Sequence, residues 1–267
     1  MIQKVIKAVV PRFIKSRLSD EFKYAYSRQL EDLKSSYSFR FSRSQQNRML
    51  AEYHLCQGLE GYFSFARRWL GVGAVQLPEE IGPALAYLSE ESPQRVCEIG
   101  TEHGGTTLLS SQLLPTVTMM IGVDLFIKNR PKLERLRREH QRFHLINGSS
   151  CSRTTMDRIT KLLDGSQLDV AFIDGNHSYE GVLKDFLLYR HLVRENGFIL
   201  FHDIVQDHRA RYGRETARWA GGVPKLWTQL KSLYPFREFV QDYDQDGLGI
   251  GVIRYSHGVA LPQELLP

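Results

Sequence analysis

FIDGNHSYEGV (residues 172–182) begins as an apolar strand and places an acid, a glycine and a histidine where the hydrophobic run stops. A second stretch, FILFHD (residues 198–203), repeats this pattern further along the chain. In a sheet of parallel strands, ligands bind outside the carboxyl ends of the strands. Asp174 and Asp203, which follow these two runs, are therefore expected to lie side by side in one site.

The region around these stretches alternates between short apolar runs and helical patterns. The strand-like runs lie at 95–99, 119–124, 143–146, 168–173 and 197–202, and the helical stretches lie near 131–141, 153–164 and 178–193. Short apolar strands separated by helices indicate a mainly parallel sheet that is covered on both faces. REFVQDY, DQDG and LGIGVIRY (residues 237–255) then predict two strands joined by a tight turn. The predicted fold class is α/β with a Rossmann-like sheet.

Changes in the pattern of apolar and polar residues divide the chain into three parts. We expect a helical N-terminal extension over residues 1–77, the sheet domain over 78–257 and a short tail over 258–267. In the first 18 residues, Ile, Val and Phe recur at helical spacing between Lys and Arg. This pattern favours a basic amphipathic helix that packs on the domain or on a second copy of the chain, as in a homo-oligomer. The alternative is a peripheral contact with an anionic membrane surface.

Charge and cysteine content narrow the class of protein. The formal charge of +5 combines +7 in residues 1–50 with −2 in the remainder, so the main body is not basic and nucleic acid is not an expected partner. The cysteines, Cys56, Cys97 and Cys151, are odd in number and widely spaced, which indicates neither a disulfide framework nor a zinc site. This cysteine content fits a reducing cytoplasm, and no apolar run approaches the roughly 20 residues of a membrane span. We therefore expect a cytoplasmic protein.

The turn after the first strand, EIGTEHGGTT (residues 98–107), has spaced glycines but lacks the G-x-G-x-x-G pattern of dinucleotide sites. Glycines here let the backbone approach a ligand at the N-terminus of the next helix. Glu98 would repel a pyrophosphate but suits an amine, such as the methionine part of S-adenosylmethionine. The candidate cofactor-binding residues lie at strand ends or in the turns after them: Glu98, Gly100, Thr101, Gly104, Asp124 for the ribose hydroxyls, and Gly148 and Ser149 beside the adenine.

Five motifs occur in a fixed order: EIGTEHGGTTLL, GVDL, FIDGNHSYEGVLKDF, GFILFHDI and GGVPKLWTQLK. They resemble the class I S-adenosylmethionine-dependent methyltransferases, and more narrowly the group that contains the cephalosporin hydroxylase and rhamnosyl O-methyltransferase family and the macrolide sugar O-methyltransferases. The resemblance covers roughly residues 78–255. It implies a seven-stranded sheet with an antiparallel last strand, S-adenosylmethionine as cofactor, and methyl transfer to a hydroxyl of a sugar or glycosylated metabolite.

His177, three residues after Asp174, is the candidate catalytic base, with Asp174 as its partner, because imidazole titrates near neutral pH. In the sugar methyltransferases that the chain resembles, the histidine of the Asp-x-x-His pattern has this role. The alternative is that His177 only caps the helix that follows it.

Asp174 and Asp203 would also offer oxygen ligands to a divalent metal such as Mg²⁺, which lowers the pKa of an acceptor hydroxyl. The resemblance supports such a metal. Where those enzymes have two adjacent acids, however, this chain has His202 followed by Asp203. Imidazole suits Mn²⁺, Fe²⁺ or Zn²⁺ better than Mg²⁺. The predicted ligands are Asp174, His202 and Asp203, and the identity of the metal stays open.

The Arg-rich residues 204–227 have no strong periodicity and are expected to form a lid over the substrate. Trp219 and Trp227 are candidates for stacking on a sugar, although the helix that holds Trp227 also fits a core position. His103 is expected only to shape the glycine turn, and Asp185 to be a solvated or salt-bridged helix residue.

Two other functions remain open from the sequence. The group that the chain resembles includes a protein named for hydroxylation, so a hydroxylase-like activity is one alternative. A non-catalytic nucleotide-binding protein of the same fold is the other.

Overall fold

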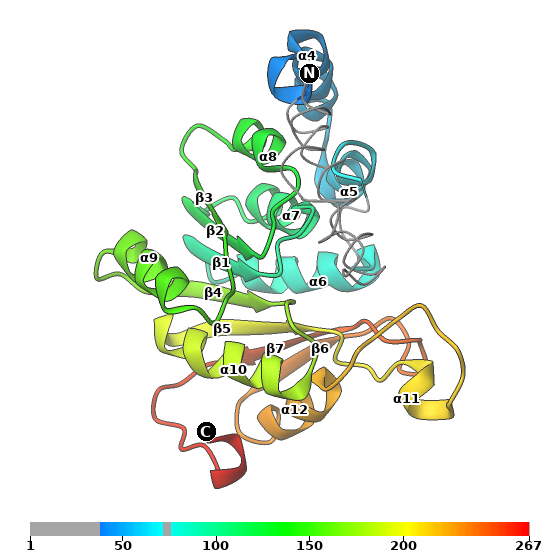
Figure 1. Cartoon of the computed structure of the whole chain (residues 1–267), viewed down its shortest axis with the longest axis vertical. Coiled ribbons are helices and arrows are strands. Elements are labelled where there is room, and N and C mark those ends of the chain that lie inside the picture. Colours follow the sequence, from blue (N-terminus) through cyan, green and yellow to red (C-terminus); the bar gives the residue numbers. More distant parts are fainter. Residues whose placement is uncertain (1–37, 72–75, 267) are drawn as a thin grey trace, which may run out of the picture.

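A seven-stranded sheet forms the centre of the described chain (Figure 1). The computed structural model describes residues 38–71 and 76–266. The strand order is β3-β2-β1-β4-β5-β7-β6. The strands are β1 Arg95–Ile99, β2 Met119–Asp124, β3 Arg142–Asn147, β4 Leu168–Ile173, β5 Val193–His202, β6 Phe236–Phe239 and β7 Ile250–Arg254. β1 to β5 are parallel, and β7 runs antiparallel to β5 and β6. The predicted Rossmann-like sheet with an antiparallel last strand is confirmed.

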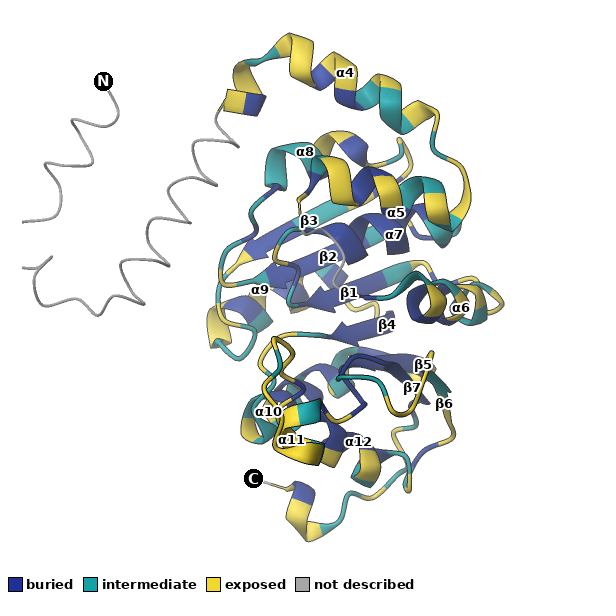
Figure 2. Cartoon of the chain, turned by 90° about the vertical axis from the view of Figure 1, so that its right-hand side faces the viewer, coloured by how far each residue is buried: buried dark blue, intermediate teal, exposed yellow. Residues whose placement is uncertain are grey.

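Helices cover both faces of this sheet, because successive strand residues point to opposite faces. The helices are α4 Arg43–His54, α5 Gly58–Trp69, α6 Pro78–Ser89, α7 Gly105–Leu113, α8 Arg130–Leu136, α9 Arg153–Leu163, α10 Tyr179–Tyr189, α11 His208–Tyr212 and α12 Val223–Leu230. Ile99 and Ile199 pack with α9, α10 and α12 on one face, and Val96 and Phe198 pack with α6 and α7 on the other. Figure 2 shows the buried strands between these helical layers. Burial on both faces explains the nearly continuous apolar runs of the strands.

The described part of the N-terminal extension packs on the sheet domain. Met49 of α4 and Phe65 of α5 share a buried cluster with Leu108 of α7 and Leu133 of α8. None of the described helices is both long and apolar enough to cross a membrane. The predicted basic amphipathic helix falls in residues 1–37, outside the described residues.

Two helices are shorter than their sequence pattern predicts. The helix expected near 131–141 is α8, which ends at Leu136, because the backbone N–H of Arg138 donates to the side chain of Gln141 (3.0 Å) and not to a helical carbonyl. The helix expected near 178–193 is α10, which ends at Tyr189. A single 3₁₀ turn follows it, and β5 then begins at Val193 because this residue pairs with Leu168 of β4, ahead of a bulge.

The C-terminal hairpin is present, but a loop of residues 240–249 replaces the expected tight turn. Glu80 of α6 organises this β6–β7 loop from a buried position. Its carboxylate accepts hydrogen bonds from the backbone N–H of Gly249 (2.9 Å), the side chain of Gln245 (2.7 Å) and the backbone N–H of Gln241 (3.3 Å). The loop is therefore held by a helix that lies far from it in the sequence.

Candidate active site

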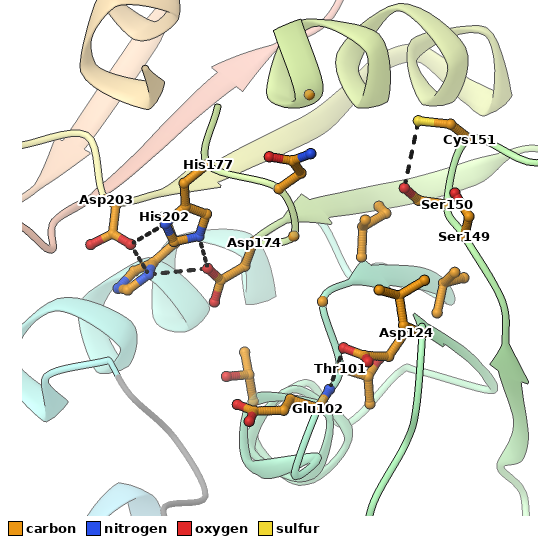
Figure 3. Close-up of a pocket in the computed structure, with 18 of the residues that line it drawn as sticks. Thr101, Glu102, Asp124, Ser149, Ser150, Cys151, Asp174, His177, His202 and Asp203 are labelled. Atoms are coloured by element: carbon orange, nitrogen blue, oxygen red, sulfur yellow. Dashed lines mark hydrogen bonds and ion pairs between the residues drawn. The ribbon is translucent and has the colours of Figure 1, made fainter. Parts of the chain in front are cut away.

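The loops at the carboxyl ends of the parallel strands enclose a cavity of about 570 Å³ (Figure 3). This volume is typical of small-molecule sites. Each of the five parallel strands contributes to the lining: Gly100 and Thr101 follow β1, Asp124 ends β2, Gly148 and Ser149 follow β3, Asp174 and His177 follow β4, and His202 and Asp203 lie at the end of β5. All the residues predicted for the site line this one cavity, except Glu98 and Gly104.

Asp124 presents a fixed carboxylate on the β2 side of the cavity. Its two oxygens accept hydrogen bonds from the backbone N–H groups of Glu102 (2.9 Å) and Phe126 (2.8 Å). Burial raises the pKa of Asp124, although these two N–H groups oppose the shift. Each carboxylate oxygen keeps a further lone pair. Asp124 can therefore accept hydrogen bonds from two neighbouring hydroxyls of a ligand.

The glycines of the turn after β1 have different tasks. Gly100 has a φ of 93°, and a Cβ at this position would overlap the backbone carbonyl of Asp174. Glycine alone meets both requirements without strain. Gly104 precedes α7 with a φ of 83°, and a Cβ there would overlap Leu133 of α8. Gly104 therefore sets the packing of two helices and does not line the cavity.

Glu98 lies behind the cavity wall. Strand residues alternate between faces, so Glu98 points to the same side as Val96, toward α7, where it accepts a hydrogen bond from the Thr107 hydroxyl. The side chain is 1% exposed, and burial raises the pKa of Glu98 to about 8. The direct contact between Glu98 and a ligand amine that the sequence suggested does not fit this position.

Two carboxylates and two imidazoles meet on the β4–β5 side of the cavity (Figure 3). Asp174 Oδ1 lies 3.3 Å from His177 Nε2 and 3.3 Å from His202 Nδ1. Asp203 Oδ2 lies 3.3 Å from the Nδ1 atoms of both histidines. Burial would raise the pKa of Asp174, but His202 and His177 outweigh it and lower this pKa to about 2. Burial would likewise lower the pKa of His202, but the two carboxylates raise it to about 10.

His177 is oriented by contacts on both sides of its ring. Nδ1 lies 2.8 Å from the carbonyl oxygen of Trp219. Since a carbonyl only accepts, Nδ1 carries the proton in this bond, and Nε2 is the nitrogen left to take up another. Burial would lower the pKa of His177, but the contacts with Asp174 and its other neighbours raise it. Ser178 is the N-cap of α10, with its hydroxyl accepting from the N–H of Gly181 (3.1 Å), so helix capping does not account for His177.

Both ends of the segment predicted as a substrate lid, residues 204–227, belong to the packed body of the protein, and the role of the segment as a lid stays a prediction. Ile204 and Val205 are buried, and α12 begins at Val223. We use the word lid below for residues 206–222, which include α11 and end beside the cavity.

The two tryptophans of the predicted lid lie in different environments. Trp227 is 2% exposed and donates from Nε1 to Glu238 (2.6 Å), so it belongs to the core, as the alternative for this residue expected. Trp219 is 63% exposed, and its ring stacks on that of His177 with 5.8 Å between ring centroids. Only Trp219 therefore offers an aromatic face next to the candidate base.

Gln76 is a site residue that the sequence pattern did not reveal. It is 3% exposed and lies just before α6. Its Nε2 donates to Asp174 Oδ2 (2.8 Å), and its Oε1 accepts from the Thr106 hydroxyl (2.6 Å). Gln76 precedes Asp174 by 98 residues and belongs to no motif, so only the fold brings the two together.

Two other polar residues near the cavity have structural contacts. His103 Nδ1 lies 2.9 Å from the Leu70 carbonyl oxygen and ties the glycine turn to the end of α5, in line with its expected role in shaping the turn. The sequence suggested that Asp185 is solvated or salt-bridged, but its side chain is buried, with 1% exposed. It accepts a hydrogen bond from the thiol of Cys151 (3.2 Å), and burial raises the pKa of Asp185.

The acidic and imidazole side chains have the composition of a cation site. Asp174, His177 and Asp203 each offer one donor atom, and these three atoms lie within 4.8 Å of one another. This set contains His177 where the sequence predicted His202. Two carboxylates and one imidazole suit Mn²⁺, Fe²⁺ or Zn²⁺ better than Mg²⁺. The donor set therefore fits a divalent cation of the first transition series.

Sequence comparison with known families agrees with this geometry. Residues 62–261 match the family described as Rhamnosyl O-methyltransferase/CmcI. The chain belongs to this family. The match covers every strand of the sheet and the residues named above that line the cavity.

One relative of this rhamnosyl O-methyltransferase/CmcI family member matches part of the chain. The uncharacterized protein R132 of Acanthamoeba polyphaga mimivirus is 36% identical over 132 residues, which are 47% of this chain and 58% of that protein. The chain thus spans less than two thirds of that relative.

Solved structures share the fold at low identity. The O-methyltransferase TomG from Streptomyces achromogenes, involved in Tomaymycin synthesis and solved in complex with SAM, is 16% identical, with 76% of this chain and 92% of that chain covered and a TM-score of 0.50. The O-methyltransferase from Bacillus cereus in complex with SAH is 14% identical, with 95% and 96% covered and a TM-score of 0.50.

Proposed function

We propose that this protein binds S-adenosylmethionine in the cavity and transfers its methyl group to a hydroxyl of a sugar or glycosylated metabolite. The observation that carries the proposal is that one cavity has the fixed Asp124 carboxylate on one side and His177 with Asp174 on the other. Membership in a family named for rhamnosyl O-methylation supports a sugar hydroxyl as the acceptor.

The cofactor would lie along the ends of β1 to β3. S-adenosylmethionine supplies an electrophilic methyl group on a sulfonium. Asp124 would accept hydrogen bonds from the ribose hydroxyls, and Gly148 and Ser149 would border the adenine. Gly100 and Thr101 would let the backbone approach the methionine part closely. The SAM-bound structure of TomG, which has the same fold, supports this cofactor.

His177 would act as the general base. Its Nε2 accepts the proton of the acceptor hydroxyl while that oxygen forms its bond to the methyl carbon and the methyl–sulfur bond breaks. Asp174, 3.3 Å from Nε2, stabilises the imidazolium that results. A positioned base of this kind contributes roughly 10²- to 10⁴-fold to a rate.

A divalent cation is a second means of activating the hydroxyl at the same place. Asp174, His177 and Asp203 would hold it, and it would lower the pKa of the acceptor hydroxyl. Because a cation bound to His177 competes with protonation of that ring, the two versions are alternatives. Exhaustive dialysis against EDTA separates them: retained activity supports the base, whereas activity that is lost and then restored by Mn²⁺ supports the cation.

The exposed face of Trp219 supports a carbohydrate acceptor. An exposed indole can pack on the apolar face of a sugar ring, and Trp219 lies next to His177 of the cavity. Contact of the N-terminal residues 1–37 with a membrane or with a second copy of the chain stays a prediction from the sequence.

Calorimetry with S-adenosylmethionine tests the cofactor half of the proposal. We expect binding by the full chain, strong weakening in Asp124→Ala, and unchanged binding in Asp157→Ala, an exposed acid on α9 that serves as the matched control. No binding by the unaltered chain, or equal binding by all three proteins, would contradict the proposal.

Mass spectrometry of p-nitrophenyl glycosides, including the α-L-rhamnoside, tests the acceptor half. A mass gain of one methyl group is expected for at least one glycoside. A hydroxylated product that forms only with oxygen and an iron reductant would instead favour the hydroxylase-like alternative. Cofactor binding without transfer to any acceptor would favour a non-catalytic protein.

A further inference from the structure

We infer that Gln76 is a positioning residue of this active site, which holds the Asp174 carboxylate in the orientation that serves His177. The inference rests on the proposed function, because it assigns Gln76 a part in that reaction. Gln76 lies two residues before α6, so the end of the N-terminal extension contributes a side chain to the site in addition to the loops of the sheet.

The orientation of the Gln76 amide is fixed at both ends. The Thr106 hydroxyl donates to Oε1 (2.6 Å), and Nε2 donates to Asp174 Oδ2 (2.8 Å). A hydroxyl can donate to the amide oxygen, whereas a carboxylate only accepts, so the opposite orientation of the amide would place two acceptors against each other at Asp174. Both Gln76 and Thr106 are buried, and water therefore competes little with these bonds.

The two carboxylate oxygens of Asp174 therefore have different partners. Oδ2 is held by Gln76, while Oδ1 lies 3.3 Å from His177 Nε2 and 3.3 Å from His202 Nδ1. Without the amide, the carboxylate loses the bond that defines its rotation, and Oδ1 is no longer directed at Nε2. Gln76 therefore acts on the reaction through Asp174 and does not need to touch either substrate.

The proposed test compares full-length variants that change one partner at a time. Gln76→Ala removes the donor, Gln76→Glu replaces it with an acceptor of the same shape, and Thr106→Val removes the group that orients the amide. Gln167→Ala is the matched control, because Gln167 is exposed at the opposite end of β4 from Asp174. Two readouts are used. The first is steady-state kinetics, which give kcat and the KM values for S-adenosylmethionine and for the p-nitrophenyl glycoside that the unaltered enzyme methylates. The second is the ¹⁵N chemical shifts of the His177 ring at fixed pH.

We expect Gln76→Ala to lower kcat by about 10- to 100-fold, the usual effect of removing a group that orients a site residue, with KM for S-adenosylmethionine changed less than twofold. Gln76→Glu should lower kcat at least as much, and Thr106→Val less. The ¹⁵N shifts of His177 should move in the three variants and stay in place in Gln167→Ala. In a double-mutant cycle, Gln76→Ala should have little further effect once Asp174→Asn is present.

Unchanged kcat and unchanged His177 shifts in Gln76→Ala would overturn the inference. A rise in KM for the glycoside alone would also overturn it, because this result would show that Gln76 binds the acceptor directly. Additive effects of Gln76→Ala and Asp174→Asn on kcat would overturn it as well. If the unaltered enzyme methylates no glycoside, the proposed acceptor class fails, and the His177 shifts still decide the role of Gln76.

Discussion

The ring of His177 lies 2.8 Å from the backbone carbonyl oxygen of Trp219, so the candidate base takes its orientation from the lid. A second bond reinforces this link, because the carbonyl of His177 accepts from the N–H of Gly222 (2.7 Å). Two hydrogen bonds therefore join the lid backbone to the residue that is the candidate base. Changes in the lid backbone should alter the chemical step as well as acceptor binding.

The side chain of Trp219 should affect acceptor binding more than chemistry, because its carbonyl remains when the side chain is changed. We expect Trp219→Ala to raise KM for the acceptor roughly 2- to 10-fold, the range that corresponds to the loss of one aromatic stacking contact, with kcat nearly unchanged. Trp219→Phe should recover most of the affinity. Steady-state kinetics measure this, with Tyr243→Ala, an exposed aromatic on the β6–β7 loop, as the control. A fall in kcat with unchanged KM would contradict the stacking role.

The rate should rise with pH, because His177 acts as a base only when it is neutral. Burial would lower the pKa of His177, but Asp174 raises it, so kcat/KM should increase through an apparent pKa above 6.5. Asp174→Asn removes the carboxylate that does most to raise the pKa of His177 and should therefore move this apparent pKa downward. His177→Ala should lower kcat by roughly 10²- to 10⁴-fold and abolish the dependence. A wild-type profile that is flat from pH 5 to 9, or that Asp174→Asn leaves in place, is the adverse result.

Glu98 should make the protein less stable as the pH rises. Burial raises the pKa of Glu98 from 4.5 to about 8. The stability that the protonated Glu98 carboxyl contributes to the folded state is therefore fully present below pH 4.5 and is lost as the pH rises through 8. Within this window the free energy of unfolding should fall by at most about 1.4 kcal/mol per pH unit on account of this group. Glu98→Gln, which has the same shape and no charge, should remove this slope. Urea denaturation at pH 5, 7 and 9 measures it.

Glu79→Gln, at an exposed position of α6, is the control for this experiment. Parallel pH profiles for the wild type and Glu98→Gln would show that burial does not control the ionisation of Glu98.

Loss of the Glu80 carboxylate should loosen the β6–β7 loop. Glu80→Ala leaves three donors without their acceptor, and of these the backbone N–H of Gly249 is buried. Because a buried donor left unpaired costs about 1–3 kcal/mol, we expect the free energy of unfolding to fall by an amount in this range, with faster proteolysis within residues 240–249. Glu79→Ala provides the comparison for general effects on α6. Equal cleavage of the two variants at this loop would refute the role of Glu80.

The acids at the strand ends were accessible to sequence reasoning, since each directly follows an apolar run and parallel strands end at one edge. Asp124, Asp174 and Asp203 illustrate this rule. Glu98 lies within β1 and not after it, so its side chain points either toward the cavity or toward a covering helix. The apolar pattern of a strand that is buried on both faces does not show which of the two it is.

Other features depend on partners that are far apart in the sequence. Gln76 meets Asp174, and Glu80 meets the β6–β7 loop, without any local motif that marks either residue. The same limit applies to Asp185, whose place on α10 fits a solvated position until the fold buries it. Periodicity reports which face of an element is apolar but not which distant polar group lies against it.

The contact between Gly100 and the carbonyl of Asp174 has a consequence for engineering. It joins the turn on the donor side to the turn that carries Asp174 and His177 through main-chain atoms alone. The spacing between the two reactants is therefore a property of the scaffold, which side-chain libraries do not change. Variants selected for new acceptors should accumulate substitutions between residues 206 and 222, and hardly any at position 100.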